Sequence, residues 1–401
     1  MIFLMASAMT TLQSTTVAVS YAPRDMQVET VIGSQAFLEM EPLWTRVVED
    51  ADIGHPFAEH LWARTWLECF GGGSEPYILV VRSGGRPIGI APLLRSGARI
   101  GGVPVRRLSF FYNDHVPRAD FIVADRHNEV HAAIWAHLRA DKSWDALQLC
   151  QIPDESQTLA ALTRLAINDG HAAHVWQSGV SPYIPLTTTW LKYSEQLPTK
   201  HRANLRNRFK RLGALGPCQV QVVDSPVGLA AALPSVLQLE AAAWKGQAGT
   251  AIICQPELTN FYSLLAHRAA ERGWLRLHFL ESGGRQIAFD YSLEYKRKSF
   301  LLKLGYDPGF SAYSPSSLLA HEVIKAAFER GDIEYNFLGE FMDWKRPWAK
   351  QGRTHSWLFV FSRHWNARLA CALKFDLLPR LKRSPLRPAA AWASRFIGSA
   401  L

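Results

Sequence analysis

A short sequence signature occurs twice in this chain and limits the folds that it can adopt. Residues 83–88 read Ser-Gly-Gly-Arg-Pro-Ile, and residues 282–287 read Ser-Gly-Gly-Arg-Gln-Ile. Each signature lies between two apolar runs, and a Gly-Gly pair supplies the positive φ angles that a tight hairpin turn requires. Helical segments precede both hairpins, and a strand, a helix and a further strand follow both in the same order. The sequence therefore predicts two copies of one α/β module.

The predicted elements divide the chain into four parts. In the first copy, residues 35–185, two helices precede the hairpin, and two strands flank a helix at 127–140. In the second copy, residues 186–378, strands at 299–305 and 334–338 flank a helix at 317–330. We expect an α/β (α+β) fold in which helices flank mixed central sheets. Residues 1–34 are predicted to be a flexible extension, and residues 379–401 a basic tail that contains prolines.

Length, charge and cysteine content narrow the class of protein. A chain of 401 residues suits two domains. The five cysteines are scattered without a Cys-x-x-Cys pair, which predicts a reducing cytoplasm and neither a disulfide framework nor a structural zinc. A net charge of +9 allows an anionic partner, and the tail allows weak peripheral contact with anionic lipid. We expect no membrane span and no secretory signal.

The most specific motif lies in residues 306–348 of the second copy. It reads Tyr-Asp-Pro-Gly-Phe-Ser-Ala-Tyr-Ser-Pro-Ser-Ser-Leu-Leu from Tyr306, then Tyr-Asn-Phe-Leu-Gly-Glu from Tyr335, and then Asp-Trp-Lys-Arg-Pro-Trp from Asp343. Together with residues 200–212, it resembles the GNAT-like family that includes the bacterial cellulose biosynthesis protein CelD acetyltransferases. Wider relatives are the FemABX aminoacyl transferases, which also carry two GNAT-like copies. The resemblance implies a tandem duplicated GNAT fold that uses acetyl-CoA or another acyl-CoA, without a metal.

This chain departs from the family pattern at three places. Ser316 stands where glycine is usual, and Asn336 stands where aspartate is usual in the closing strand. The glycine-rich pyrophosphate loop of ordinary GNAT enzymes is also missing, as is typical of this branch. These departures motivate one alternative, a non-catalytic accessory protein of polysaccharide synthesis.

The resemblance places the acyl donor in the second copy. In GNAT folds two central strands splay apart and the pantetheine arm enters the gap, and the matching segments here are residues 299–304 and 334–338. A helix start follows the first strand, where the helix dipole and free N–H groups favour a pyrophosphate. A helix cap alone is the other interpretation of this segment. The residues expected to bind the cofactor there are Lys303, Tyr313, Ser314, Ser316, Ser317 and Leu318.

A predicted helix at 200–212 carries a basic stripe beside its apolar one. Arg202, Arg206 and Lys210 recur at helical spacing. They can receive the phosphates of CoA, of a nucleotide-linked sugar or of tRNA, and a solvated helix face is the alternative. We expect Arg202 and Arg206 to contact the cofactor.

An amine that attacks a thioester needs a base for its proton and an acid for the leaving thiolate. Asp290 lies in the middle of a strand, where a carboxylate is unfavourable unless it is used in the reaction or paired, for example with Lys303 on the neighbouring strand. Glu340 follows the closing strand, and a tyrosine hydroxyl can protonate the thiolate. Lys345 matches a lysine of the family and can bind phosphate or an acidic acceptor. The catalytic candidates are Asp290, Glu340, Tyr306 and Lys345.

The sequence thus favours a cytoplasmic N-acyltransferase that transfers the acyl group directly to an amine. From the family's associations, the acceptor is a small molecule or a saccharide-linked group of exopolysaccharide or cell-envelope synthesis. A FemABX-type enzyme that uses aminoacyl-tRNA is a further alternative. We expect the first copy to be mainly structural and to line the acceptor cleft.

Overall fold

Both predicted hairpins form where the Gly-Gly pairs stand. In the computed structural model, which describes residues 25–242 and 251–383, residues 84–85 and 283–284 all have positive φ angles between 55° and 83°. The first hairpin joins β2 (Ser74–Ser83) to β3 (Arg86–Ile100), and the second joins β9 (Leu275–Ser282) to β10 (Arg285–Tyr295). Only glycine adopts this backbone conformation without strain, so these pairs determine where each hairpin turns.

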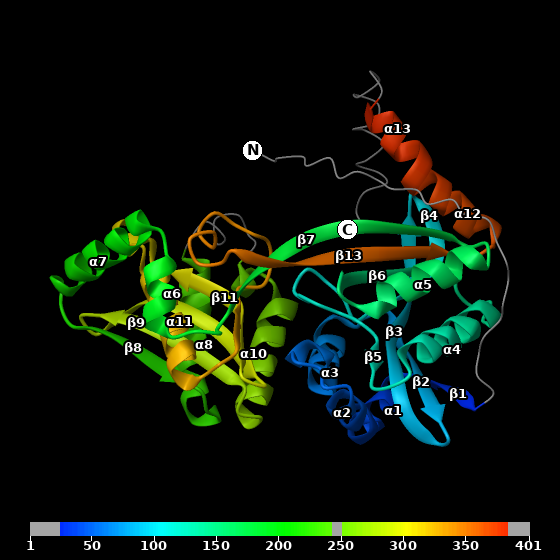
Figure 1. Cartoon of the computed structure of the whole chain (residues 1–401), viewed down its shortest axis with the longest axis horizontal. Helices are drawn as coiled ribbons and strands as arrows, with labels where there is room; N and C mark the ends of the chain where they lie inside the picture. The colour runs from blue at the N-terminus through cyan, green and yellow to red at the C-terminus, as the bar shows by residue number, and fades with distance from the viewer. Residues whose placement is uncertain (1–24, 243–250, 384–401) are drawn as a thin grey trace.

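The first copy surrounds its hairpin with short helices and five further strands, as Figure 1 shows. Helices α1–α3 precede the hairpin, α4 and α5 follow it, and the copy ends with a long strand. The elements are β1 (Met26–Ile32), α1 (Ser34–Glu39), α2 (Glu41–Asp50), η1 (Pro56–Ala58), α3 (His60–Phe70), β4 (Val103–Ser109), β5 (Ile122–Val123), α4 (His127–Ala140), β6 (Ala146–Pro153), α5 (Gln157–Asn168) and β7 (Ala172–Pro185).

The second copy repeats this order around its own hairpin, and its chain then returns to the first copy. Its elements are α6 (Trp190–Gln196), α7 (Thr199–Gly213), β8 (Cys218–Val223), α8 (Pro226–Ala241), η2 (Ile252–Cys254), α10 (Pro256–Glu271), β11 (Lys298–Tyr306), η3 (Pro308–Tyr313), α11 (Pro315–Arg330), β12 (Glu334–Asn336), β13 (Gln351–Phe361), α12 (Trp365–Cys371), η4 (Ala372–Leu377) and α13 (Leu378–Arg383).

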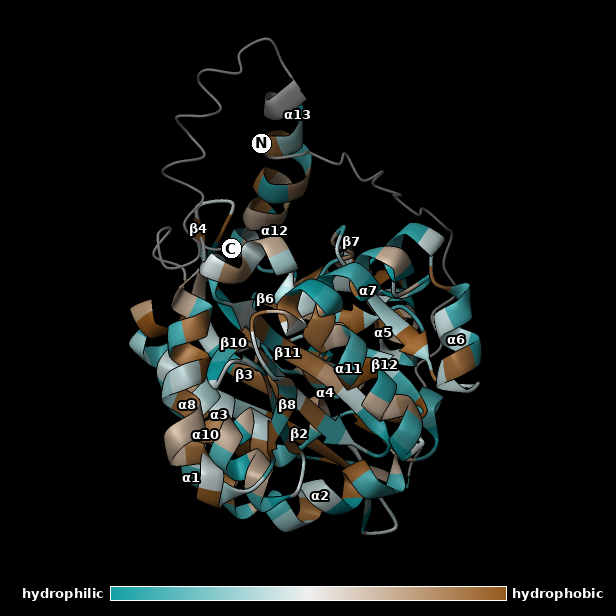
Figure 2. Cartoon of the chain, turned by 90° about the vertical axis from the view of Figure 1, so that its left-hand side faces the viewer, coloured by the Kyte–Doolittle hydropathy of each residue, from teal (hydrophilic) through white to brown (hydrophobic). Residues whose placement is uncertain are grey.

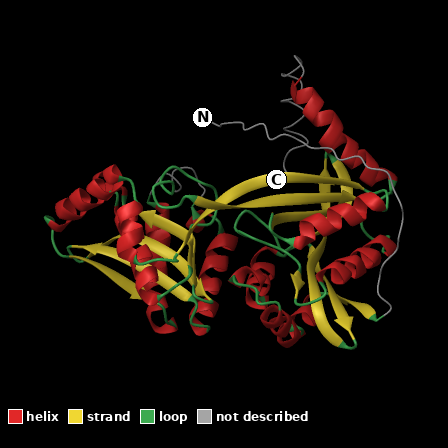
Figure 3. Cartoon of the chain, viewed as in Figure 1, coloured by secondary structure: helices red, strands yellow, loops and turns green. Residues whose placement is uncertain are grey.

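All strands of the described residues belong to one mixed sheet. Its order is β1-β2-β3-β4-β6-β13-β7-β12-β11-β10-β9-β8, with β5 paired to β3. Helices cover both faces (Figure 3). The predicted mixed α/β class is confirmed, and the two parallel pairs, β4 with β6 and β11 with β12, occupy equivalent places in the two copies.

The strands that join the copies were not predicted from the sequence. β13 comes from the end of the second copy but pairs antiparallel with both β6 and β7 of the first. Figure 1 shows β7 and β13 running together as long ribbons from one half to the other. Strand pairing therefore crosses the predicted boundary at residue 185. The division into two domains stays a prediction.

Two predictions at the chain ends need correction or fall outside the described residues. Residues 26–32, predicted to belong to a flexible extension, form β1, which pairs with β2 along its whole length. Residues 379–383 of the predicted tail belong to α13. Residues 1–24 and 384–401 lie outside the described residues.

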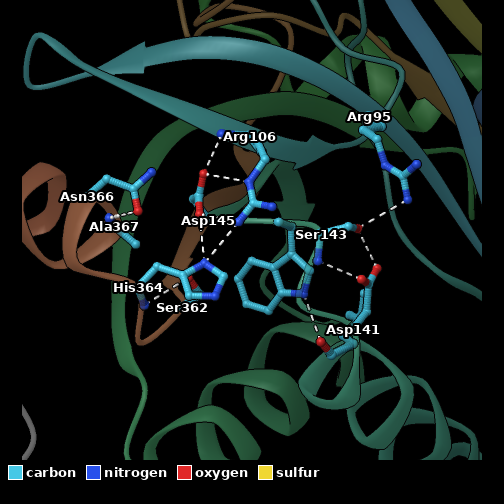
Figure 4. Close-up of polar contacts among 11 residues, drawn as sticks. Arg95, Arg106, Asp141, Ser143, Asp145, Ser362, His364, Asn366 and Ala367 are labelled. Carbon is cyan, nitrogen blue, oxygen red and sulfur yellow. Dashed lines mark hydrogen bonds and ion pairs between the residues drawn. The ribbon is translucent and has the colours of Figure 1, made fainter.

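One carboxylate of the first copy binds the segment that follows β13. Asp145, 2% exposed at its side chain, accepts hydrogen bonds from Arg106 Nε at 3.0 Å and Nη2 at 2.7 Å, and His364 Nδ1 lies 2.9 Å from its Oδ1 (Figure 4). Burial would raise the pKa of Asp145, but these hydrogen bonds hold it well below its usual range. The carboxylate thus links β4, the start of β6 and the segment after β13.

The two copies share a hydrophobic core along the seam between them. Helix α3 of the first copy packs on α10 of the second, with the rings of Trp62 and Phe261 5.6 Å apart, and Phe57 contacts Phe300 of β11 at 5.3 Å. On the opposite face of the sheet, the strands of the second copy pack under α11. Within residues 25–242 and 251–383, every helix is too short or too polar to cross a lipid bilayer.

Candidate functional site

The parallel strands β11 and β12 part after three residue pairs. Lys298, Ser299 and Phe300 pair with Glu334, Tyr335 and Asn336, and β12 then ends while β11 continues to Tyr306. From residue 301 onward, no described strand pairs with β11 on that edge, so a ligand can approach its backbone there. The pairing of the two strands therefore ends early, as the predicted splay requires.

A helix start lies at the end of β11, as predicted. α11 begins after Ser314, a left-handed residue with φ 48°, and its first turn contains no acidic residue. The amides of Ser317 and Leu318 both donate to the Ser314 carbonyl, at 2.9 and 3.3 Å. The Ser316 hydroxyl is buried and has no hydrogen-bond partner among the described residues. The attraction for an anion therefore comes from the helix dipole and the serine hydroxyls.

The basic helix α7 packs on α11 but reaches the helix start with a different residue than expected. The guanidinium of Arg211 lies 5.1 Å from the ring centre of Tyr313, just before α11. Arg202 lies nine residues earlier, about 14 Å along the helix, and its buried Nε has no described partner. Arg206 and Lys210 are exposed. Figure 2 shows α7 largely in the hydrophilic colour. Arg211 is thus the better placed cation, and the sequence pattern of three evenly spaced basic residues did not single it out.

Lys345 lies inside the loop that follows β12. It is 5% exposed, and its ammonium donates to the carbonyls of Leu338 and Glu340, at 2.5 and 2.9 Å. Burial lowers its pKa to about 8. Leu338 and Gly339 both have positive φ angles, 50° and 53°. Lys345 therefore holds a strained turn next to the splay, and the exposed Glu340 side chain leaves from that turn.

Asp290 is buried under α11 in a polar network. It is 3% exposed, it accepts hydrogen bonds from Ser292 and, at 3.4 Å, from Tyr335, and His278 Nδ1 lies 3.5 Å away. Lys303 pairs in register with Tyr291, so it lies on the opposite face of the sheet, where its ammonium is 5.1 Å from the ring centre of Tyr262. The structure separates these two residues.

The remaining predicted residues flank the end of β11. Tyr306 is the last residue of this strand and is partly buried against the core under α11, and Tyr313 lies in η3. Leu318 is fully buried in that core. The prediction that these residues bind the cofactor or act in catalysis stays a prediction.

A polar group without a role predicted from the sequence lies on the other face of β11. His115, from the loop after β4, has its Nδ1 3.0 Å from the hydroxyl of Tyr262 on α10, and Lys303 lies over the same ring. This cluster joins the two copies on the face away from α11. The signal available in the sequence was the polar run Asn-Asp-His at 113–115, which ends the central strand of the first copy.

The site thus has two sides with different chemistry. One side offers a helix dipole, hydroxyls and cations to an anionic group, and the other offers an imidazole and a phenol to a group that carries a proton. The described residues contain no group of three or more His, Cys, Asp or Glu side chains arranged to hold a metal ion.

Comparison with known families finds one match, to the family described as acetyltransferase (GNAT) domain, over residues 199–346. This range runs from α7 to the turn held by Lys345 and includes the splay and α11. The second copy is therefore a GNAT acetyltransferase-like domain. The finer resemblance to the CelD acetyltransferases stays a prediction. None of the curated proteins compared with the chain matches it.

Solved structures resemble the chain across both copies. FemX has a TM-score of 0.56 and 12% identity over 82% of this chain and 98% of FemX. A conserved protein of unknown function from Bacteroides thetaiotaomicron has a TM-score of 0.50 and 10% identity over 81% of this chain and 97% of that chain. A tandem GNAT protein from the clavulanic acid biosynthesis pathway has a TM-score of 0.46 and 13% identity over 83% of this chain and 98% of that one. The family match confirms the predicted GNAT fold in the second copy, and the repeated order of elements confirms its duplication in the chain. Identities this low to solved structures say nothing about activity.

Proposed function

We propose that this protein is an acyl-CoA-dependent N-acyltransferase whose donor site lies in the second copy. The observation that carries the proposal is the edge of β11 beyond Phe300, where no described strand pairs with it, in the copy in which α11 follows that strand. An acyl-pantetheine arm can lie along this edge, with its thioester carbonyl bound by a backbone N–H that also stabilises the oxyanion of the tetrahedral intermediate. The pyrophosphate of the donor would then meet Ser316, Ser317 and Arg211.

The acceptor would approach from the opposite face, in the seam between the copies. Its amine nitrogen attacks the thioester carbon, the C–S bond breaks, and the CoA thiolate leaves. His115 is placed to take the ammonium proton, because its ring is held by the hydroxyl of Tyr262 beside β11. This assigns the base to a residue of the first copy, while Asp290 and Glu340 remain the alternatives from the sequence.

Calorimetry with acetyl-CoA tests the donor site. We expect one molecule of acetyl-CoA to bind per chain. In the first copy, α4 is the helix that corresponds to α11. Arg126 at its start already pairs with the carboxylates of Asp25 and Glu129, so we expect no phosphate to bind there. Absence of heat and of a thermal shift with acetyl-CoA would favour a non-catalytic accessory protein, and two bound molecules would contradict the argument about α4.

A second candidate is a transferase that uses aminoacyl-tRNA. The observations that favour it are the similarity to FemX across both copies and the exposed basic residues of α7. Filter binding with charged tRNA separates the two candidates, because a tRNA-dependent enzyme retains charged tRNA at low salt and loses it steeply as salt rises. We also propose, from the resemblance alone, that the protein is cytoplasmic and that its acceptor belongs to exopolysaccharide or cell-envelope synthesis.

A further inference from the structure

The seam between the copies contains buried nitrogen atoms without hydrogen-bond partners. Arg118, from the loop before β5, is 6% exposed, and neither its Nε nor its Nη2 has a partner. The same holds for Nδ1 of His55, in the loop before η1, and for Nε2 of His355 on β13, which is 2% exposed. Native proteins seldom leave buried donors unpaired, so a set of them in one place indicates a missing acceptor.

Arg118 lacks a close counter-charge among the described residues. The neighbouring Arg353 is bound by Glu155 at 2.6 Å and by Glu334 at 3.4 Å, so those carboxylates are already committed. Burial and the nearby Arg353 lower the pKa of Arg118 to about 10. Burial raises the pKa of Asp120, the remaining nearby carboxyl, to about 6. An unpaired buried guanidinium is unfavourable unless a ligand completes it.

The two histidines add polar ring nitrogens without adding charge. Burial, together with Arg118, lowers the pKa of His355 to about 3 and lowers that of His55 well below its usual value. Both rings are therefore neutral at pH 7. Lys298 of β11 adds a cation from the second copy. Its ammonium lies beside Gly54, the neighbour of His55, and a Cβ atom added to Gly54 would be only 2.7 Å from that ammonium. Residues from both copies thus form this group.

The group borders the splay of β11 and β12. Tyr335 faces α11, so its neighbours Glu334 and Asn336 face the seam. Asn336, the last residue of β12, has its Oδ1 3.3 Å from Nη1 of Arg353. Arg118 and His55 line a cavity of about 30 Å³ whose other walls are apolar except for Asp120. A cavity of this size takes little more than one water-sized group, which suits a carboxylate better than a phosphate.

We propose that Arg118 and His55 bind the carboxylate of the acceptor, beside the neutral ring of His355, so that the substrate class is amines that also carry a carboxylate, such as amino acids or amino-sugar acids. The guanidinium fork matches a planar carboxylate in two parallel hydrogen bonds. The acceptor would be held by its carboxylate in the seam while its amine points to the splay. This inference rests on the proposed function for the role of the ligand, but the anion site itself does not.

The first experiment measures anion binding on the full chain by thermal shift at constant ionic strength. N-acetylglycine is the probe, N-acetylglycinamide is its neutral match, and inorganic phosphate is the second anion. We expect N-acetylglycine to raise the Tm by about 2 °C or more at saturation and the amide to have no effect. A shift with phosphate but not with N-acetylglycine would overturn the assignment to a carboxylate.

The second experiment compares Arg118→Met with Arg107→Met. Arg107 is a partly buried arginine of the same copy whose guanidinium already has partners, Ser96 at 3.2 Å and Gln148 at 3.4 Å. Arg118→Met should abolish the response to N-acetylglycine and keep or raise the ligand-free Tm, because it removes an unpaired buried charge. Arg107→Met should lower the Tm and keep the response. If Arg118→Met instead lowers the Tm and no anion shifts the wild type, Arg118 is only structural and the proposal is wrong.

The third measurement separates this inference from the proposed function. Arg118→Met should bind acetyl-CoA with wild-type heat, since the donor site lies at the other face of the sheet. In an assay of thiol release, the wild type should acetylate an amino acid at least about tenfold better, in kcat/KM, than its carboxamide, and Arg118→Met should lose this preference. Anion binding without acetyl-CoA binding would support the anion site and contradict the proposed acyltransferase. Acetyl-CoA binding without a carboxylate preference would support the acyltransferase and contradict the carboxylate site.

A further variant, Arg118→Lys, keeps the positive charge but lacks the two-pronged guanidinium. It should bind N-acetylglycine more weakly than the wild type, and equal binding would contradict the bidentate geometry.

Discussion

Lys345 holds its ammonium group inside the loop after β12, where backbone carbonyls are its partners. The role in catalysis or phosphate binding that the resemblance implies for this lysine stays a prediction, and its burial and hydrogen bonds show that it also holds the loop. It fixes Leu338 and Gly339 in left-handed conformations beside the splay. A buried lysine is unfavourable when charged, so its effect on stability depends on pH.

Lys345→Met should therefore change how stability varies with pH. The pKa of Lys345 is about 8 in the folded protein and about 10.4 in an unfolded chain. Between these values the unfolded chain binds more protons, so the free energy of unfolding rises with pH, by at most about 1.4 kcal/mol per pH unit. Urea unfolding at pH 8, 9 and 10 should show this rise in the wild type and a smaller one in Lys345→Met. Parallel curves would mean that the ammonium is not desolvated.

At the scale of elements, α7 and α11 meet where the proposed donor phosphates would lie. The apolar stripe of α7 packs on α11, with Phe209 and His321 in ring contact at 5.4 Å, and this leaves the basic residues along the exposed side. Only the end of α7 reaches the start of α11, through Arg211 and Tyr313. The packing of the two helices therefore decides which of several similar cations can reach a ligand.

Arg211→Ala should weaken acetyl-CoA binding about tenfold, which corresponds to about 1.4 kcal/mol for one lost charge-assisted contact. Lys142→Ala, at an exposed position of the first copy, removes the same charge and is the matched control. Calorimetry measures both at one ionic strength. Equal weakening in the two variants would show a general field effect rather than a contact, and no weakening in Arg211→Ala would remove α7 from the donor site.

For the whole molecule, the return of β13 into the first copy joins the two halves. Because β13 lies between β6 and β7, the second copy cannot separate without breaking strand pairs of the first. Asp145 secures this arrangement through Arg106 and His364. We expect the chain to unfold cooperatively and the seam to keep a fixed geometry.

Asp145→Asn should destabilise the protein by about 1 to 2 kcal/mol at pH 7, because Arg106 and His364 lose a charged partner and Arg106 is half exposed to screening solvent. The pKa of Asp145 is lowered in the folded state, so its stabilisation is present above about pH 4 and is lost as pH falls below that value. Denaturant unfolding at pH 7 and pH 3 should show a difference between variant and wild type that shrinks at pH 3. A constant difference would assign the effect to packing.

The local sequence determined the elements and the duplication of this protein. Gly-Gly pairs set the hairpins, helical and strand periodicities set most of the elements, and the motif from Tyr306 to Trp348 pointed to the splay and to the start of α11. These features are readable because each depends on neighbouring residues, through backbone conformation and side-chain spacing.

Only the tertiary structure decided the partners of β7 and β13, the burial of Lys345 and the contents of the seam. β13 pairs with strands about 180 residues away, and such pairing depends on which long-range contacts bury the most surface, which no local pattern records. Arg118, His55 and His355 come from three distant segments. In the sequence, each of them is an ordinary polar residue. They lack hydrogen-bond partners only in the folded protein, because the fold excludes water from around them.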